Sequence, residues 1–304
     1  MNKSNYKERY VEPLDPKTLY APQKERIDSN SSQSGLYTIE YPKTSLSSLI
    51  VPEETGKQIR SILTKIKYYD LLYNKFGLRE IDKTGGRTLI NFYGPPGTGK
   101  SFAAEAIANE LGKKIIKANY AQIESKFVGE TPKNIKEIFA AAKKEDAVVV
   151  FDEADSILGS RLSSVTQSTD HAVNVSKSVM LLEMDNFDGI MIFTTNFGEN
   201  YDSAFVRRII GHIKFELPDD NNREKIFKGL IPKELPVDIT EKDIEIIVAK
   251  SNGFSGGDLL NMVIYASSSA VERDGEMCKV SLNDFLEACY LIKNAKKEIG
   301  KTNK

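Results

Sequence analysis

Three continuous apolar runs in the middle of the chain predict strands of a buried sheet. They read TLINFY, AVVVFD and GIMIFTT and lie at residues 88–93, 147–152 and 189–195. The runs are rich in β-branched residues and do not alternate with polar ones, which is typical of strands covered on both faces. We therefore expect a parallel sheet that is flanked by helices.

Apolar residues at helical spacing occur before and between these runs. One set predicts a helix that begins after Gly56 and continues to a break at Gly77: Ile59, Ile62, Leu63 and Ile66. Thr131 and Pro132 predict a second helix start, with Thr131 as the N-cap and proline in the first helical position. The buried face of this second helix is expected to carry Ile135, Ile138, Phe139 and Ala142. Strands and helices thus alternate, which indicates an α/β domain.

The strand-like runs stop after Pro218, and the remaining pattern is helical. Three boxes of the form S/T-x-x-D precede apolar residues at helical spacing: Thr240 with Asp243, Ser255 with Asp258, and Ser281 with Asp284. In such a box two polar side chains satisfy backbone N–H groups at a helix start. This part of the chain is expected to form a small all-helical domain.

The chain is expected to have four parts. Residues 1–45 contain four prolines, interleaved charges and the polar run DSNSSQSG, which favours a flexible N-terminal arm. Residues 46–218 are expected to form the α/β domain, and residues 219–292 the helical domain. Residues 293–304, with the lysine-rich sequence KNAKKEIGKTNK, are expected to be a solvated C-terminal tail.

Charge and cysteine content argue against several classes of protein. The formal net charge is −1, so no global field attracts nucleic acid or an anionic membrane. The N-terminus lacks the apolar core of a signal peptide, and no apolar run approaches the roughly 20 residues that span a membrane, so a cytoplasmic protein is expected. Cys278 and Cys289 lack CxxC spacing, and the only histidines are His171 and His212, which disfavours structural zinc and disulfides. The two cysteines are expected to be buried or half-buried reduced thiols.

The segment GPPGTGKS at residues 94–101 fits the phosphate-binding pattern GxxxxGK[ST] between a predicted strand and a predicted helix. Glycines let backbone N–H groups turn toward phosphate oxygens, and the start of the following helix adds positive charge. Lys100 is placed for the β and γ phosphates, and Ser101 offers a hydroxyl to Mg²⁺. The expected nucleotide-binding residues are Gly94, Pro95, Pro96, Gly97, Thr98, Gly99, Lys100, Ser101 and Phe102. The alternative is a glycine-rich turn with a solvent-exposed lysine.

Polar residues end the second and third apolar runs. Asp152 and Glu153 follow VVVF, at the carboxyl end of a strand, where α/β sheets bind their ligands. Asp152 would hold Mg²⁺ through its water shell, and Glu153 would polarise the attacking water. Asn196 would orient that water or sense the γ phosphate. The alternatives are an exposed acidic turn for the first pair and a strand-ending turn former for Asn196.

The order and spacing of five motifs resemble the AAA family of ATPases over roughly residues 46–292: GPPGTGKS, FDEAD, TTN, the pair RR and GFSGGDL. The resemblance implies a P-loop NTPase fold, in which a parallel sheet flanked by helices is followed by a small all-helical lid domain. It implies ATP and Mg²⁺ as ligands, with Gly256 and Gly257 close to the adenine and ribose. It also implies a homo-oligomeric ring, expected to be a hexamer, in which Arg207 and Arg208 complete the neighbouring subunit's nucleotide site.

A further segment, SKFVGETPKNIKEIFAAA at residues 125–142, resembles the family's first pore loop and the helix after it. The resemblance implies that Phe127 grips an extended polypeptide in a central channel, with Lys126 and Val128 beside it. The alternative for Phe127 is a cap on the local core, and the alternative for the arginine pair is a surface location beside the strand IKFEL. The segment MDNF at residues 184–187 resembles the family's intersubunit signalling loop.

The chain also departs from the family pattern. The helix before LLEMD reads HAVNVSKSVM and lacks an arginine, and RRIIGHI replaces the usual arginine-arginine-phenylalanine beginning. These differences leave open which of Arg207 and Arg208 is the main finger. Asn186 stands where glycine is usual, and the arm is too short to be the folded substrate-recruiting domain of many relatives.

The favoured function is ATP hydrolysis by a ring that threads, unfolds or disassembles an unidentified protein partner. One alternative is an ATP-controlled assembly scaffold or switch with slow turnover. Another is a DNA-handling relative such as a clamp loader or replication initiator. The net charge of −1 and the lack of a recognisable DNA-reading segment argue against that class. A protease is disfavoured because no peptidase segment follows the helical domain.

Overall fold

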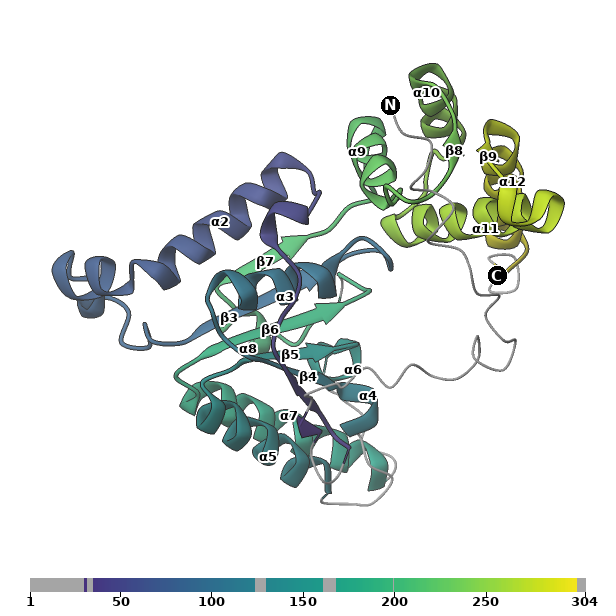
Figure 1. Ribbon diagram of the computed structural model, residues 1–304. Helices are drawn as coiled ribbons and strands as arrows, with labels where there is room; N and C mark the ends of the chain where they lie inside the picture. Colours follow the sequence, from purple (N-terminus) through teal and green to yellow (C-terminus); the bar gives the residue numbers. More distant parts are fainter. Residues whose placement is uncertain (1–29, 32–34, 124–129, 161–167, 199, 300–304) are drawn as a thin grey trace.

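A mostly parallel sheet forms the centre of the larger part of the protein (Figure 1). The computed structural model describes residues 30–31, 35–123, 130–160, 168–198 and 200–299. Within them the sheet has the strand order β1-β2-β4-β5-β6-β3-β7. The strands are β1 (Asn30–Ser31), β2 (Thr38–Glu40), β3 (Thr88–Tyr93), β4 (Ile115–Asn119), β5 (Val148–Asp152), β6 (Ile190–Thr195) and β7 (Gly211–Lys214). The predicted α/β class is confirmed.

The sheet is mixed at one edge. The strands from β4 through β5, β6 and β3 to β7 run parallel, whereas β2 is antiparallel to β4 and β1 is antiparallel to β2. The parallel core follows from the apolar runs, which need cover on both faces. The antiparallel edge was not expected, because two- and three-residue strands carry too little periodicity to be seen in sequence.

Helices cover both faces of the sheet, as Figure 1 shows. They are α2 (Glu53–Lys67), α3 (Lys100–Glu110), α4 (Tyr120–Ile123), α5 (Glu130–Glu145), α6 (Asp155–Leu158), α7 (Ser168–Asn186) and α8 (Ser203–Val206), with short turns η1 (Leu46–Ser48), η2 (Asp70–Lys75) and η3 (Leu78–Glu80). Successive side chains of a strand point to opposite faces. Val148 and Val150 of β5 therefore pack with α2 and α3, and Phe151 packs with α5 and α7.

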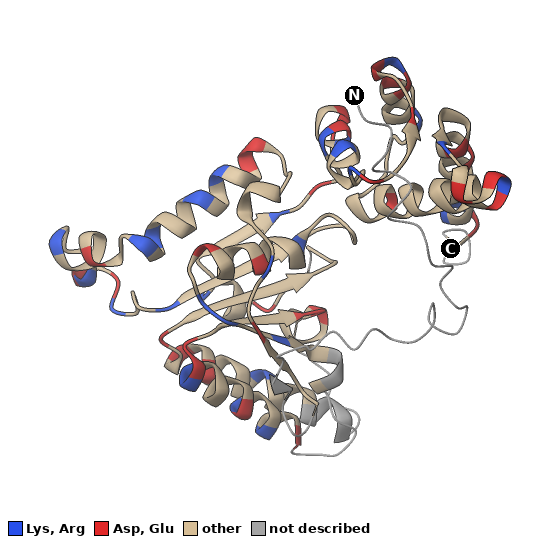
Figure 2. Ribbon diagram, viewed as in Figure 1, with Lys and Arg blue, Asp and Glu red and all other residues tan. Residues whose placement is uncertain are grey.

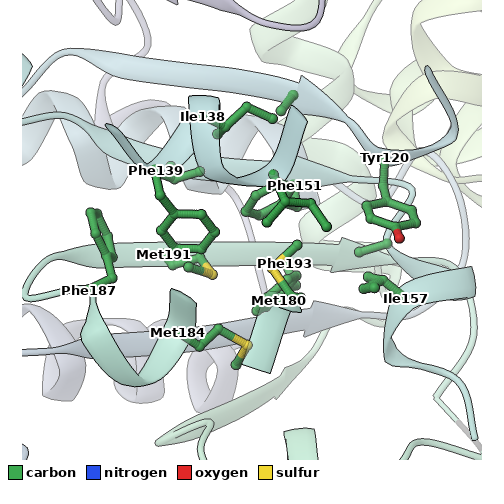
Figure 3. Packing of buried hydrophobic residues seen from close by; sticks show 14 of the residues in the cluster. Tyr120, Ile138, Phe139, Phe151, Ile157, Met180, Met184, Phe187, Met191 and Phe193 are labelled. Atoms are coloured by element: carbon green, nitrogen blue, oxygen red, sulfur yellow. The ribbon is translucent and has the colours of Figure 1, made fainter. Parts of the chain in front are cut away.

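Aromatic rings make up much of the core between the sheet, α5 and α7 (Figure 3). Phe139 lies edge-on to Phe187, with ring centroids 5.2 Å apart, and Phe151 stacks on Phe193 at 5.7 Å. The predicted buried face of α5 is confirmed, since Ile135, Ile138, Phe139 and Ala142 are all buried.

Two predicted helix starts differ from the structure. Thr131 lies within α5, whose described residues start at Glu130, so its prediction as the N-cap is wrong. Pro132 still falls in the first turn, where a missing N–H removes no helical hydrogen bond. Gly56 lies in the first turn of α2 and not before it, because the helix begins at Glu53. The predicted end at Gly77 also differs, because α2 ends at Lys67 and a separate π-helix, η2, follows it before Gly77, where φ is +76°.

The C-terminal part is a group of helices beyond the sheet, joined to it after β7 (Figure 1). It contains α9 (Asp220–Leu230), α10 (Glu241–Lys250), α11 (Gly256–Asp274), the turn η4 (Gly275–Met277) and α12 (Leu282–Ile299). Both predicted boxes at Thr240 and Ser255 cap α10 and α11 reciprocally, and Ser281 donates to Asp284 at the start of α12. The description as all-helical is wrong in one detail, because Val237–Asp238 (β8) pairs with Val280–Ser281 (β9).

Part of the segment expected to be an arm joins the sheet. Ile39 and Tyr37 pack against the α5 and α7 core, and β2 pairs with β4. The ammonium of Lys117 then bridges Glu40 at 3.0 Å and Glu105 at 2.8 Å. These contacts attach residues 37–40 to the sheet edge through side chains that are distant in sequence.

The expected tail also differs from the structure. Helix α12 continues to Ile299, so residues 293–299 are helical. Cys278 and Cys289 are buried in the C-terminal core, as expected. No helix in the described residues is long and apolar enough to cross a membrane.

Candidate functional site

The polar residues predicted to act together meet at one edge of the sheet. Parallel pairing places Tyr93 of β3 beside Thr195 of β6, and Asn119 of β4 beside Asp152 of β5. The carboxyl ends of these strands therefore converge, which is where open α/β sheets bind ligands. The loop at residues 94–99, the acidic pair and Asn196 all follow these strand ends.

The loop between β3 and α3 leaves no room for larger side chains. Gly97 has a φ of +73°, and a Cβ atom there would lie 2.6 Å from the Ser255 hydroxyl oxygen. A Cβ atom on Gly94 would lie 2.0 Å from the carbonyl oxygen of Phe215. The loop can therefore pass close to β7 and to the helical part only with glycine at these positions. It ends at Gly99, the N-cap of α3, so the start of α3 faces the same edge.

Lys100 is held inside the loop and is not the solvent-exposed lysine of the alternative interpretation. Its ammonium donates to the carbonyl oxygens of Gly94 at 2.8 Å and Pro95 at 2.9 Å, and to the Asn196 side-chain oxygen at 3.0 Å. Only 7% of the residue is exposed. Burial lowers the pKa of Lys100, although nearby Asp152 and Asp155 oppose that shift. The loop lysine and Asn196 are thus directly linked.

Two side chains whose oxygen atoms could bind Mg²⁺, Ser101 and Asp152, lie together at the predicted magnesium site. The Ser101 hydroxyl donates to Asp152 Oδ2 at 3.2 Å, and Thr194 donates to the other oxygen of the same carboxylate. A hydroxyl and a carboxylate that keep room for water are ligands that suit Mg²⁺, which retains much of its hydration shell. The residues therefore fit the ion, and the direct role of Ser101 and the water-mediated role of Asp152 stay predictions.

Glu153 has a partner that sequence reasoning missed. Its φ is +53°, and its Oε2 accepts a hydrogen bond of 2.8 Å from the side-chain amide of Asn119. Asn119 ends β4, the strand next to β5, and only the strand order reveals this proximity. A polar residue at the end of the run IIKAN was the available signal.

A cavity of about 750 Å³ opens in front of these groups. The predicted residues that line it include residues 96–101 of the loop, Phe102, Asp152, Glu153, Asn196, Gly256 and Gly257, whereas Gly94 and Pro95 do not line it. Residues 48–52 and the apolar side chains of Ile226, Leu230 and Leu260 also line it, and none of these was predicted. The N-terminal segment and the helical part therefore form apolar walls opposite the polar sheet edge, a combination typical of small-molecule sites.

The helical part contacts the loop directly at Gly256 and Gly257. The Gly257 N–H donates to the Gly97 carbonyl oxygen at 3.2 Å. A Cβ atom on Gly256 would lie 3.3 Å from the same oxygen, which is tight. Both glycines thus lie at the cavity, and their approach to a nucleotide stays a prediction.

The arginine pair lies away from this cavity and is divided between two environments. Neither Arg207 nor Arg208 lines the cavity. Arg208 donates from Nε and Nη2 to both oxygens of Asp185, at 2.9 and 2.7 Å, and Arg87 Nη1 reaches the same carboxylate at 2.7 Å. Hydrogen bonding from Arg208, with a smaller contribution from Arg87, lowers the pKa of Asp185 to about 2 despite partial burial. Arg207 is exposed, and its side chain contacts no charged partner in the described chain.

One predicted site lies outside the part of the chain that the structure describes. Lys126, Phe127 and Val128 lie outside the described residues, so the pore-loop assignment stays a prediction. Of the segment MDNF, Met184 and Phe187 are buried in the α5 and α7 core, and Asp185 holds the arginines. The segment therefore lies at the end of α7, where Asp185 contacts Arg208 and Arg87 but not Arg207.

Comparison with known proteins places this site in a family context. Residues 90–217 match the ATPase family associated with various cellular activities (AAA). The chain is 30% identical over 266 residues to the proteasome-activating nucleotidase of Methanopyrus kandleri, covering 85% of this chain and 58% of that protein. It is 33% identical over 218 residues to the 26S proteasome subunit RPT4 of Saccharomyces cerevisiae, covering 69% and 49%. The chain thus spans only about half of the length of these relatives.

A solved structure supports the fold. The crystal structure of the FIGL-1 AAA domain in complex with ADP aligns with a TM-score of 0.69 and 21% identity, covering 84% of this chain and 87% of that one. At this identity the likeness speaks for the fold alone.

Proposed function

Residues 90–217 form a domain of the AAA family of ATPases, and on this premise we propose that the protein is an ATP-hydrolysing ring motor that remodels a protein partner. The observation that carries the proposal is the meeting of Lys100, Asp152, Glu153 and Asn196 at one wall of the cavity. The ring is a hexamer of identical subunits and works in the cytoplasm. Similarity to a proteasome-activating nucleotidase supports a protein as the substrate.

ATP binds in the cavity with its phosphates in the loop at residues 94–101. The backbone N–H groups and the start of α3 stabilise the phosphate charge, and Lys100 moves from its carbonyl partners to the β and γ phosphate oxygens. Residues 48–52 and the helical part enclose the base and ribose. Ser101 and Asp152 would hold Mg²⁺, which would supply positive charge to balance that of the phosphates.

The Glu153 carboxylate accepts a proton from the attacking water. Asn119 fixes the orientation of that carboxylate through its hydrogen bond, and Asn196 lies beside Lys100, where it reaches the γ phosphate or the water. A general base that is correctly placed contributes about 10²–10⁴ in rate. These residues therefore activate and orient the attacking water within one subunit.

Arg207 acts on the nucleotide of the neighbouring subunit. Its exposed guanidinium lies away from its own cavity and is available to a second copy. A cation supplied in this way neutralises the transferred phosphoryl group and contributes about 10³–10⁵ in rate in related nucleotidases. Arg208 takes a supporting role because Asp185 holds it in its own subunit.

Substitution of Glu153 by Gln tests the proposal. The Glu153→Gln protein should bind ATP as tightly as the parent, lose about 10²-fold or more in turnover, and persist as a ring in light-scattering measurements with ATP. The variant Glu245→Gln, altered on α10 far from the cavity, serves as the control. Normal turnover by Glu153→Gln, or a protein that stays monomeric with saturating ATP, would contradict the motor. Slow turnover that no protein partner stimulates would instead favour the assembly switch.

A further inference from the structure

The last turns of α12 reach the first turn of α11, beside the candidate nucleotide site. The ammonium of Lys296 lies 2.6 Å from Asp258 Oδ2 and 5.8 Å from the centroid of the Phe254 ring. Lys293, one turn earlier, lies 6.0 Å from the same ring. Phe254 is 1% exposed, so the lysines cover a buried ring while their charged ends stay at the surface. This end of the helix had been expected to be a solvated tail.

Asp258 also caps the start of α11 through its hydrogen bonds with Ser255. Its Oδ2 accepts from the Ser255 N–H at 2.7 Å and from the Ser255 hydroxyl at 2.8 Å, and its own N–H donates back to the Ser255 oxygen at 3.2 Å. This reciprocal pair is the capping box at the start of α11, with Ser255 as the N-cap residue. Burial alone would raise the pKa of Asp258, but the Lys296 ammonium and the Ser255 donors lower it. One carboxylate oxygen therefore serves both the cap and the lysine.

The cap is in direct contact with the loop that is predicted to bind phosphate. The Ser255 oxygen lies 2.6 Å from where a Cβ atom on Gly97 would be, and the Gly257 N–H donates to the Gly97 carbonyl oxygen at 3.2 Å. The carboxylate that holds Lys296 belongs to Asp258, the residue directly after Gly257, whose N–H binds the loop. A displacement of Asp258 therefore moves Ser255 and Gly257 relative to Gly97.

We propose that Lys296 is a positioning residue for ATP binding, which acts by holding Asp258 and through it the start of α11 against the phosphate-binding loop. The inference rests on the proposed function, because it names how the helical part is kept over the site. Lys296 touches neither the cavity nor the groups assigned to hydrolysis. Its loss should therefore weaken nucleotide binding and leave the chemical step intact.

The test measures binding and turnover separately in the full chain. Affinity is measured with the fluorescent nucleotide N-methylanthraniloyl-ADP, and KM and kcat are measured with ATP. Lys296→Met should raise the dissociation constant and KM about fivefold and leave kcat within about twofold, a size expected for one partly exposed charge-assisted pair. Lys296→Arg should restore the parent affinity. Lys297→Met, altered at the next position on the same helix, should behave as the parent.

A double substitution separates positioning from general packing of α12. Asp258→Asn keeps an oxygen that accepts from Ser255 but loses the charge that attracts Lys296. In that background Lys296→Met should cause no further loss of affinity. A further loss of the same size would mean that Lys296 acts through packing, and it would overturn the proposal. Unchanged affinity in Lys296→Met alone would overturn this inference but not the ATPase, whereas a parent protein that binds no nucleotide would overturn both.

Discussion

The side-chain amide of Asn119 donates a hydrogen bond to the carboxylate of Glu153, with 2.8 Å between Nδ2 and Oε2. The two residues end neighbouring parallel strands, β4 and β5, and Glu153 adopts a backbone φ of +53° that directs it away from the regular strand. The orientation of the proposed general base therefore depends on a residue 34 positions earlier in the chain.

Removal of this hydrogen bond should impair turnover more than binding. In Asn119→Ala the Glu153 carboxylate loses the donor that fixes it, and a misplaced base is a poor catalyst. We expect kcat for ATP to fall about tenfold, with KM changed less than about twofold. Steady-state ATPase assays at saturating nucleotide provide the measurement. An unchanged kcat would show that Glu153 needs no support from β4.

Mixing of two inactive variants tests whether Arg207 acts across a subunit interface. Lys100→Ala should lose nucleotide binding, and Arg207→Ala should lose about 10³-fold in turnover, so each alone is inactive. Mixed rings contain interfaces at which an intact Arg207 faces an intact loop, so ATPase activity should partly return. A mixture as inactive as its components would place the arginine in its own subunit's chemistry. Mixing with Arg60→Ala, altered on the exposed side of α2, supplies a control.

Loss of Asp185 should disturb Arg208 and Arg87 without touching the nucleotide cavity. Asp185→Ala removes the acceptor for Arg208 and Arg87 and leaves two partly buried guanidinium groups without their anion. We expect kcat to fall about tenfold at unchanged ADP affinity, since the loss affects the transition state. Glu183→Ala, two residues earlier on the same helix, is the matched control. Equal kcat in the two variants would contradict a positioning role for Asp185.

The attachment of the edge strand should depend on pH through Glu105. Burial alone would raise its pKa, but hydrogen bonds from Lys117, the Lys43 N–H and Thr44 lower it from 4.5 to about 2. A lowered folded-state pKa stabilises the fold above pH 4.5, and that contribution disappears as the pH falls toward 2. Glu105→Gln should lower the free energy of unfolding at pH 7 by about 1 kcal/mol, because solvent screens part of this partly exposed charge. Urea titrations should show the two proteins converging in stability at low pH, and a constant difference would contradict the assignment.

Phe127 provides a test of substrate handling that is independent of hydrolysis. Phe127→Ala should keep the parent ATPase rate, because the residue is assigned to no step at the nucleotide, but it should abolish unfolding of a protein substrate. Phe127→Tyr retains an aromatic ring and should retain activity. Unfolding of a fluorescent protein substrate with ATP is the readout. Full unfolding by Phe127→Ala would refute the pore role.

Much of the candidate site could be predicted because its signals are local. The loop at residues 94–101 is a contiguous segment whose glycines, lysine and serine have individual roles, and Asp152 and Asn196 directly follow recognisable strands. The capping boxes at Thr240 and Ser255 could also be predicted from sequence, since the two residues of each box lie within four positions of one another. Charged side chains gave less information. Acidic and basic residues intermingle along α5 and the C-terminal helices (Figure 2), so their pairing cannot be inferred from order.

Sequence by itself determined the three apolar strands β3, β5 and β6, the phosphate-binding loop and the class of the fold, because burial on both faces and a tight turn impose patterns on adjacent residues. The tertiary structure alone decided that Asn119 meets Glu153, that Asp185 holds Arg208 and leaves Arg207 exposed, and that Lys296 reaches Asp258. Each of these pairs joins elements that are distant in the chain. Their proximity depends on which strands become neighbours and how helices pack. The periodicity of residues within one element does not reveal which other element it will contact.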